Sequence, residues 1–379
     1  MKRTLIITLE YPPQVGGIAT YVKNLGEALV PEQTVILAPF LKGEKHLVTQ
    51  EAGLKIFRTK QLSRFFWPHW LKLFWQVRKI VKKEKIEVII VHHILPVGYV
   101  AVLINFFRKI PFIIFSHGTD IAAASRRPWK RRMVKIICQR ATQIICNSAS
   151  LARRFSLQFT EFSHKVQVVY PGPEALFFAT PNQEKVRALA ERLAIAGRPT
   201  IISVARMVDG KGFPHLVRVI KKVADRSPSL AWLIIGTGPK LAEILDLVQK
   251  NSLQNIVRFM GEVPHHELPD YFHASTVFTL LTHPDNGFEE GLGLVFLEAA
   301  AAGLPCVAGK SGGVEEAVLN GQTGYVFDAY QDENAIADTL YDLINNPDLA
   351  KKLGQAGKTR VTTEFNFPNQ LKKLAPWLD

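Results

Sequence analysis

The sequence predicts an α/β protein with two Rossmann-like, doubly wound domains, and three observations support this fold class. Short, almost continuously apolar runs such as VIIVH (88–92) are typical of parallel strands that are covered on both faces. Segments with the apolar spacing of helices alternate with these runs. The chain has 379 residues, which is too long for a single ordinary core.

The predicted strands form two series with a break between them. The first contains TLIITL, VIIVH, PFIIFSHG and QIICNS, and the second contains TIISVAR, AWLIIGTGP, IVRFMGEV, VFTLLTH, PCVAG and GYVFD. Between them, residues 168–183 are rich in proline and polar side chains. We therefore expect domains at 1–173 and 174–358, followed by a helical segment at 359–379 that packs back on the first domain.

The composition favours a soluble globular protein without a structural metal. Apolar residues make up 47% and charged residues 21% of the chain. The three cysteines are widely spaced and lack the pairing of a zinc site, which favours a reducing, cytoplasmic compartment. Residues 88–107 carry no formal charge, but His92, His93 and Pro96 interrupt them. A strand, a turn and a core helix are therefore expected there, not a membrane span.

Two loops after strands of the first series contain candidate binding residues. Gly16 and Gly17 open a helix, where bare N–H groups either approach an anion or simply form a turn. His117 and Asp120 follow the run PFIIFS. His117 is either structural or a donor of a hydrogen bond, to a sugar hydroxyl or, when protonated, to an oxygen that develops charge.

The second series contains a pair of cations on a glycine-rich loop. Arg206 and Lys211 lie five residues apart in SVARMVDGKG, directly after a strand. A guanidinium and an ammonium at this spacing suit a diphosphate, although a solvated basic loop has the same composition. The loop IIGTGP contains Gly236 and Gly238. These glycines either keep the backbone accessible to a ligand or form a plain turn from strand to helix.

Two glutamates flank a glycine pair in EEGLGLVFLEAAAAG. Residues eight apart on a helix are offset by about 80°, so Glu290 and Glu298 would not share one face. A helix that begins near Leu294 instead leaves Glu290 in the preceding loop and places Glu298 one turn in. The bare segment Gly291–Leu294 would then offer N–H groups and the positive end of the helix to a phosphate.

The segment EGLGLVFLEAAAAGLPCVAGKSGGVEEAVLNGQTGYVF resembles the E-x7-E signature of the retaining GT-B glycosyltransferases of family 4. The stretches YPPQVGGIATYVKNL, SVARMVDGKG, GTGP and VRFMGEV follow the same order and similar distances as in that family, so the resemblance covers essentially the whole chain. It implies the GT-B fold, in which two Rossmann-like domains face a central cleft.

The resemblance also implies roles for individual residues. Glu298 matches the glutamate that binds the ribose, and Glu290 matches the one near the transferred sugar. The catalytic group would comprise His117, Arg206, Lys211 and Glu290. The donor-binding group would comprise Gly17, Arg206, Lys211, Val263, Glu290, Gly291, Leu292, Gly293, Leu294 and Glu298. Gly16 and Asp120 would lie on the acceptor side.

The sequence departs from the family at two places. The usual PNGVD-like stretch is replaced by YPGPEALF, with Pro173 and Glu174, so acceptor contacts cannot be transferred. Glu289 and Glu290 are adjacent, but only Glu290 precedes GLG at the right distance from Glu298. The resemblance is strongest to bacterial glycolipid α-mannosyltransferases, which implies a retaining, metal-independent hexosyltransferase without a cofactor, with GDP-mannose as donor. Alternatives are a UDP-sugar-dependent transferase of the same fold and a sugar-nucleotide epimerase.

Basic charge is concentrated in the first half of the chain. Residues 1–178 hold 27 lysines and arginines against 10 acidic residues, and the rest holds 20 against 23. Aromatic and basic residues interleave at 55–85 and 126–135, as in segments that lie on anionic lipid or as in an ordinary amphipathic helix. We expect peripheral binding to the inner face of the plasma membrane, a lipid-linked or glycan acceptor and no nucleic acid. The predicted membrane-binding residues are Arg64, Trp67, Trp70, Lys72, Arg126, Arg127, Arg131 and Arg132.

Overall fold

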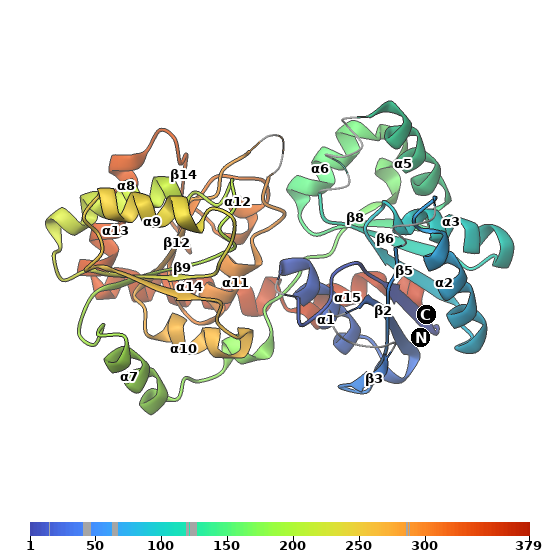
Figure 1. Cartoon of the computed structure of the whole chain (residues 1–379), viewed down its shortest axis with the longest axis horizontal. Coiled ribbons are helices and arrows are strands. Elements are labelled where there is room, and N and C mark those ends of the chain that lie inside the picture. Colours follow the sequence, from blue (N-terminus) through green and yellow to red (C-terminus); the bar gives the residue numbers. More distant parts are fainter. Residues whose placement is uncertain are drawn as a thin grey trace. The chain divides into compact units, whose positions relative to one another are not determined.

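The computed structural model describes residues 1–14, 16–40, 47–62, 67–118, 121, 127–285, 287 and 289–379. The chain forms two compact units, and each is a sheet of mostly or wholly parallel strands layered with helices (Figure 1). The first unit comprises 1–171 and 367–379, and the second comprises 172–366. The predicted fold class, two doubly wound α/β domains, is confirmed.

The sheet of the first unit has the strand order β3-β4-β2-β1-β5-β6-β7-β8. All neighbouring strands are parallel except the pair β3 and β4. The strands are β1 Thr4–Ile7, β2 Thr34–Pro39, β3 Leu47–Glu51, β4 Leu54–Thr59, β5 Val88–His92, β6 Phe112–Ser116, β7 Gln143–Cys146 and β8 Val166–Val168. The helices are α1 Gly17–Ala28, α2 Leu71–Lys83, α3 Val97–Arg108, α5 Pro128–Arg140 and α6 Ala149–Gln158.

Both faces of this sheet are buried, which explains the continuous apolar runs. Leu5 and Ile7 of β1 belong to one hydrophobic cluster, whereas Ile6 between them belongs to another. Successive side chains of a strand point to opposite faces, so the two clusters cover the two faces. The apolar stretch 88–107 becomes β5, a turn and α3, and in the described part of the chain no helix is long and apolar enough to cross a membrane.

The sheet of the second unit is parallel, with the order β11-β10-β9-β12-β13-β14. Its strands are β9 Thr200–Val204, β10 Ala231–Ile235, β11 Val257–Gly261, β12 Val277–Leu280, β13 Cys306–Gly309 and β14 Gly324–Phe327. Its helices are α7 Gln183–Arg192, α8 Phe213–Arg226, α9 Leu241–Lys250, α10 Leu268–His273, α11 Leu294–Ala301, α12 Val314–Ala317, α13 Glu333–Asn345 and α14 Pro347–Glu364.

The end of the chain returns to the first unit, but later than the boundary expected at 358. That position lies inside α14, which stays with the second unit because it packs on α11. Three side chains beyond it, Phe367, Leu374 and Leu378, enter the core of the first unit. They lie in α15 (Phe367–Leu371), a short 3₁₀ turn and α16 (Ala375–Leu378). Lys2 N–H also donates to Leu378 O at 2.5 Å, which ties the two termini together.

Candidate functional site

The loop before α11 holds one of the two signature glutamates, and the helix holds the other. Helix α11 begins at Leu294, as the spacing of the glutamates predicted, so Glu290 lies in the loop and Glu298 on the helix. Gly293 precedes the helix with φ 84°, and a Cβ there would lie 2.6 Å from the ring of Phe296. The bare backbone that we ascribed to a ligand is therefore also required by the start of the helix.

Two predicted site residues from distant parts of the sequence form an ion pair. The ammonium of Lys211 donates to the carboxylate of Glu290, 79 residues away in the chain, and both side chains are partly exposed. The N–H of Glu290 donates to Ser311 Oγ at 3.1 Å, which holds the loop in place. Arg206 is exposed, and its guanidinium has no partner among the residues that the structure describes. An anion here would meet one unpaired cation and one already paired with a carboxylate.

The loop that carries Lys211 crosses the end of β12 at van der Waals distance. Gly212 has φ 75°, and a Cβ on it would lie 1.8 Å from the carbonyl oxygen of Leu281. The N–H of His283 donates to Gly210 O at 3.0 Å. Gly212 thus allows the two loops to pack closely, and this packing fixes the position of the Lys211 backbone.

Changing Gly212 to alanine is expected to destabilise the second unit by about 3 kcal/mol, because the backbone conformation and the overlap with Leu281 both oppose a Cβ. In thermal unfolding this corresponds to a fall of roughly 6–12 °C. The matched control is Gly197→Ala, where φ is 72° but nothing lies within 4 Å of the added carbon. An equal fall for the two variants would show that the contact with Leu281 is not what requires glycine.

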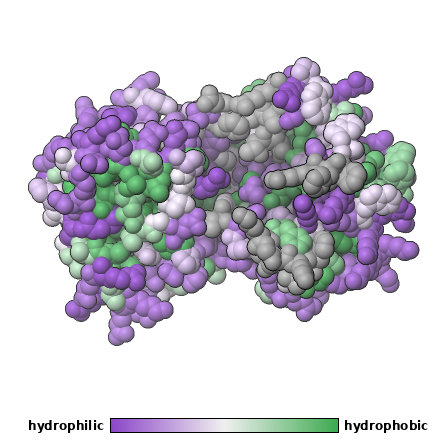
Figure 2. Space-filling model, in the orientation of Figure 1, coloured by the Kyte–Doolittle hydropathy of each residue, from purple (hydrophilic) through white to green (hydrophobic). Residues whose placement is uncertain are grey.

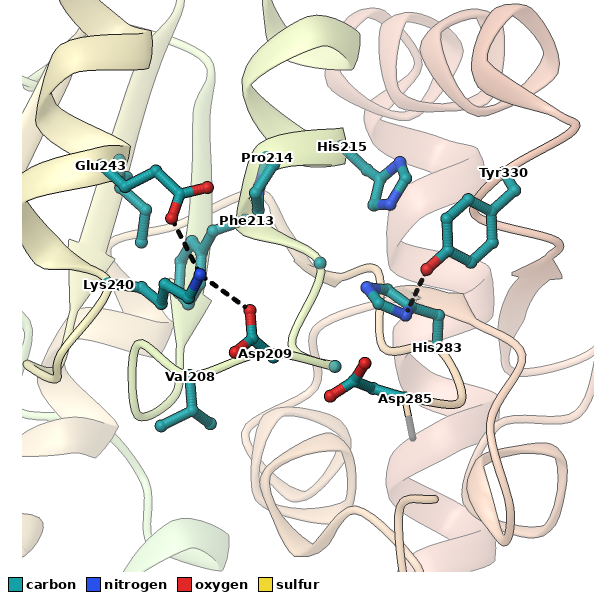
Figure 3. A pocket seen from close by; sticks show the side chains of 13 residues that line it. Val208, Asp209, Phe213, Pro214, His215, Lys240, Glu243, His283, Asp285 and Tyr330 are labelled. Atoms are coloured by element: carbon teal, nitrogen blue, oxygen red, sulfur yellow. Dashed lines mark hydrogen bonds and ion pairs between the residues drawn. The ribbon is translucent and has the colours of Figure 1, made fainter. Parts of the chain in front are cut away.

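A pocket lies beside this loop (Figure 3). On one side, Lys240 is bound between Asp209 at 3.1 Å and Glu243 at 3.0 Å. On the other side, the hydroxyl of Tyr330 meets Nδ1 of His283 at 2.9 Å. The charged groups that line the pocket are thus largely paired with one another. In the described residues no group of three or more His, Cys, Asp or Glu side chains could hold a metal ion.

Glu298 is nearly buried and is held by a histidine that we did not predict. His265 Nε2 lies 3.1 Å from Glu298 Oε1, and its Nδ1 lies 3.3 Å from Glu174 Oε1. Burial of the ring favours its neutral form, but the hydrogen bonds to Glu174 and Glu298 and their charges outweigh burial. Together they raise the pKa of His265 from 6.5 to about 9. Val263, expected near the base, is partly buried two residues before His265.

In the first unit, His117 directly follows β6 and contacts a second histidine at the end of β5. His92 Nδ1 lies 3.0 Å from His117 Nε2, and the planes of the two rings are 15° from parallel. Burial, and then the charge that His93 can carry, lowers the pKa of His117 to about 3. A neutral ring fits the alternative in which His117 donates a hydrogen bond to a sugar hydroxyl, and that role stays a prediction.

The pairing of the two rings also assigns their hydrogens. Nε2 of His92 is buried and has no hydrogen-bond partner in the described structure. A buried N–H without an acceptor is costly, so the hydrogen of His92 lies on Nδ1 and is donated to His117 Nε2. His117 then carries its own hydrogen on Nδ1, which leaves that N–H to donate elsewhere.

Of the remaining predicted residues of the first unit, Gly16 and Gly17 lie at the start of a helix. Helix α1 begins at Gly17, with Gly16 extended before it, and a Cβ at Gly17 would meet nothing within 4 Å. Asp120, Arg64 and Arg126 lie outside the described residues.

Most of the predicted membrane-binding residues are exposed. Trp67 is 86% exposed, and Lys72, Arg127, Arg131 and Arg132 also lie on the surface. Trp70 differs, because it is half-buried and its ring stacks on Tyr99 with centroids 5.5 Å apart. Its aromatic side chain belongs to the edge of the core, which the composition of the segment could not show.

Sequence reasoning missed the partners of the predicted residues. His117 is contacted by His92, and Glu298 is contacted by His265, which Glu174 holds in turn. None of these three partners lies in a motif that carried the resemblance. A signal was present, because VHH ends a predicted strand and PHHE follows FMGEV directly. Side chains at the carboxyl ends of neighbouring parallel strands lie close together.

Comparison with known proteins accounts for both halves of the chain. The model of Glycosyltransferase Family 4 matches residues 15–174, and that of Glycosyl transferases group 1 matches residues 186–360. A GDP-mannose-dependent alpha-(1-6)-phosphatidylinositol monomannoside mannosyltransferase of Mycobacterium tuberculosis is 28% identical over 100% of this chain and 98% of its own. Its counterpart in Mycolicibacterium smegmatis is also 28% identical, over 99% of this chain and 97% of its own.

Solved structures share the fold over the full length. Sucrose-phosphate synthase from Thermosynechococcus elongatus superimposes with a TM-score of 0.83 at 21% identity, covering 100% of this chain and 99% of its own. Anabaena HepE in complex with UDP-glucose gives 0.80 at 17% identity, covering 98% of each chain. With both of its halves matched and its fold shared, the chain belongs to the family 4 glycosyltransferases (glycosyl transferases group 1) and has their GT-B fold.

Proposed function

We propose that this glycosyltransferase is a retaining enzyme that moves mannose from GDP-mannose to a hydroxyl of a lipid-linked or polysaccharide-precursor acceptor. The observation that carries the proposal is the ion pair of Lys211 and Glu290 beside the start of α11, with Glu298 one turn into that helix. The relatives that are 28% identical and GDP-mannose-dependent support mannose as the sugar and GDP as its carrier. A UDP-sugar is the second candidate donor, because HepE shares the fold and was solved with UDP-glucose.

Each part of the donor has a proposed partner in the chain. The ribose diol binds the carboxylate of Glu298, and the main chain at Val263 contacts the base. The diphosphate meets Arg206, Lys211 and the positive end of α11. Gly17, at the start of α1, keeps the diphosphate role that the resemblance implies. The transferred sugar binds Glu290 and the backbone of residues 291–294. His117 keeps the role near the sugar that the resemblance implies, and its Nδ1–H is the donor it would use.

Transfer proceeds on one face of the sugar without a protein nucleophile. The bond from the anomeric carbon to the diphosphate oxygen breaks, and a bond to the acceptor oxygen forms on the same face. The proton of the acceptor hydroxyl passes to an oxygen of the leaving diphosphate. Arg206 and Lys211 stabilise the charge that develops there, and no metal or other cofactor is needed in this scheme.

In this proposal the enzyme reaches its acceptor by binding a membrane through a surface of the first unit. Helix α2 packs against α3 and α3 against α5, and the rings of Phe74 on α2 and Phe107 on α3 lie with centroids 6.5 Å apart. In Figure 2, hydrophobic atoms surface beside hydrophilic ones at the edge of this unit near α3. The aromatic–basic surface comprises the exposed residues Trp67, Trp75, Phe106, Phe107, Trp129, Lys72, Arg108, Lys109, Arg127, Arg131 and Arg132. Phe106 and Phe107, at the end of α3, extend the surface beyond the two segments predicted from sequence.

Changing Arg127 and Arg132 to glutamine is expected to weaken binding to vesicles with 30% phosphatidylglycerol by about 30-fold in low salt. Each cation near an anionic bilayer contributes about 1 kcal/mol, and added salt should remove the difference. Co-sedimentation measures it, and the matched control changes Lys351 and Lys352, exposed on α14 of the second unit. Equal losses for the two pairs would leave net charge alone as the cause and contradict a specific surface.

Thermal unfolding with GDP, UDP and ADP in parallel tests the donor. A ligand at 100 times its Kd stabilises the folded state by about 2.7 kcal/mol, which raises the Tm of a protein of this size by several degrees. We expect a shift with GDP that exceeds those with UDP and ADP, followed by incorporation of mannose into acceptor. A shift with UDP alone would select the second candidate donor, and no shift with any of them would contradict the assigned donor site.

A further inference from the structure

His265 is the side chain that connects Glu298 to the part of the sequence that departs from the family. Its ring bridges Glu298 on α11 and Glu174, which directly precedes the 3₁₀ turn Ala175–Phe178. The edge of the ring also packs on Phe177, with centroids 5.1 Å apart and the planes 67° apart. Two separate segments, residues 174–177 and α11, therefore fix its position, and every one of these contacts lies within the second unit.

Both ring nitrogens face a carboxylate, which sets the protonation of the ring. A neutral imidazole has one N–H and could donate to only one of the two glutamates, whereas an imidazolium donates to both. Glu174 and Glu298 are the charged groups of the described chain that act on this ring, and both favour its charged form. His266 and Glu267, on the same turn, instead face each other at 3.8 Å.

The contact has a consequence for Glu298. Its side chain is 7% exposed, and a carboxylate this buried requires an opposite charge with good hydrogen-bond geometry. His265 supplies that charge to Oε1, and within the part of the chain that the structure describes no hydrogen bond to Oε2 is found. The ring in turn cannot swing away, because Glu174 and Phe177 hold its other side.

We infer that His265 is a positioning residue for the donor nucleotide, and that Glu174 and His265 together hold the carboxylate of Glu298 in the orientation that accepts the ribose hydroxyls. This inference rests on the proposed function, in which the carboxylate of Glu298 binds the ribose. It also gives the departure YPGPEALF a role, because Glu174 of that stretch anchors the histidine.

If the inference is right, the selectivity for the ribose depends on pH. A histidine with a merely structural role would not produce this dependence. The pKa of His265 is raised from 6.5 to about 9, so its charge is present at pH 7 and is lost as the pH rises through about 9. The preference for a ribose over a deoxyribose should therefore be constant between pH 6.5 and 8 and should fall above that range. His265→Ala should lack this step.

The experiment compares GDP with 2′-deoxy-GDP by calorimetry in the full-length wild type and in His265→Ala. The wild type should bind GDP roughly tenfold more tightly, because the deoxy ligand lacks one hydrogen bond to a charged acceptor. His265→Ala should reduce this ratio to less than about threefold, mainly by weakening GDP. His265→Gln, whose amide can still donate one hydrogen bond, should restore part of the ratio without restoring its dependence on pH. The matched control is His266→Ala, since His266 is exposed one residue away.

The outcomes separate this inference from the proposed function. If His265→Ala weakens GDP and 2′-deoxy-GDP by the same factor, or leaves both unchanged, the histidine is structural only and the inference is wrong. If the wild type itself does not distinguish the two ligands, or binds neither, the proposed contact between Glu298 and the ribose is wrong. Should His265→Ala fail to fold, His265→Gln carries the same comparison.

Discussion

Glu290→Gln is expected to lower kcat for sugar transfer by about 100-fold while changing the Kd of the donor by less than about threefold. The carboxylate of Glu290 holds the ammonium of Lys211, and in the proposed mechanism it also contacts the transferred sugar. Glutamine keeps the volume but releases Lys211. The freed ammonium can still bind the diphosphate, so ground-state binding persists, whereas its alignment on the leaving group is lost. Losing one aligned electrostatic contact typically costs 100- to 1,000-fold in kcat.

The control for this prediction is the neighbouring residue. Glu289→Gln removes the same charge one position earlier and should change kcat by less than about threefold. Steady-state kinetics with GDP-mannose and a lipid acceptor measure both variants. If Glu289→Gln is the impaired variant and Glu290→Gln is not, the register of the two adjacent glutamates is reversed, and the role given to the Lys211 ion pair is incorrect.

Glu298→Ala is expected to raise the Kd of GDP by about 30-fold with a smaller effect on kcat at saturating donor. Hydrogen bonds from the ribose to an ionised carboxylate contribute about 2 kcal/mol, which corresponds to that factor. The substitution also leaves His265 with Glu174 as its remaining carboxylate partner. Calorimetric titration with GDP measures the effect at pH 7, where His265 is charged.

A carboxylate elsewhere in the same unit provides the comparison. Glu184→Ala, on the exposed side of α7, removes one negative charge and should leave the Kd of GDP within about twofold of the wild type. If Glu298→Ala also stays within twofold, the nucleotide does not use this carboxylate, and the assignment of the signature glutamates is wrong.

Much of the fold was predictable because its information is local. Strands that are covered on both faces, such as β1, β5 and β6, require continuous apolar runs, and the helices between strands must carry an apolar stripe. The start of α11 was predictable for a similar reason. Gly293 adopts a backbone conformation that favours glycine, and the eight-residue spacing of the glutamates excludes a single helical face. The boundary at 358 was wrong because the end of α14 depends on what it packs against.

The sequence by itself determined the two-domain architecture, which follows from periodicity. It also determined the family and the candidates Glu290, Glu298, Arg206 and Lys211, because short motifs that hold these residues resemble those of the family. Only the tertiary structure decided which groups they contact. Lys211 meets Glu290 across 79 residues, and His265 joins Glu174 to Glu298 although the three lie in separate elements. The physical reason is that hydrogen bonds and charges act over a few ångströms in space. The protonation of His117 and His265 was likewise set by neighbours that only the folded chain provides.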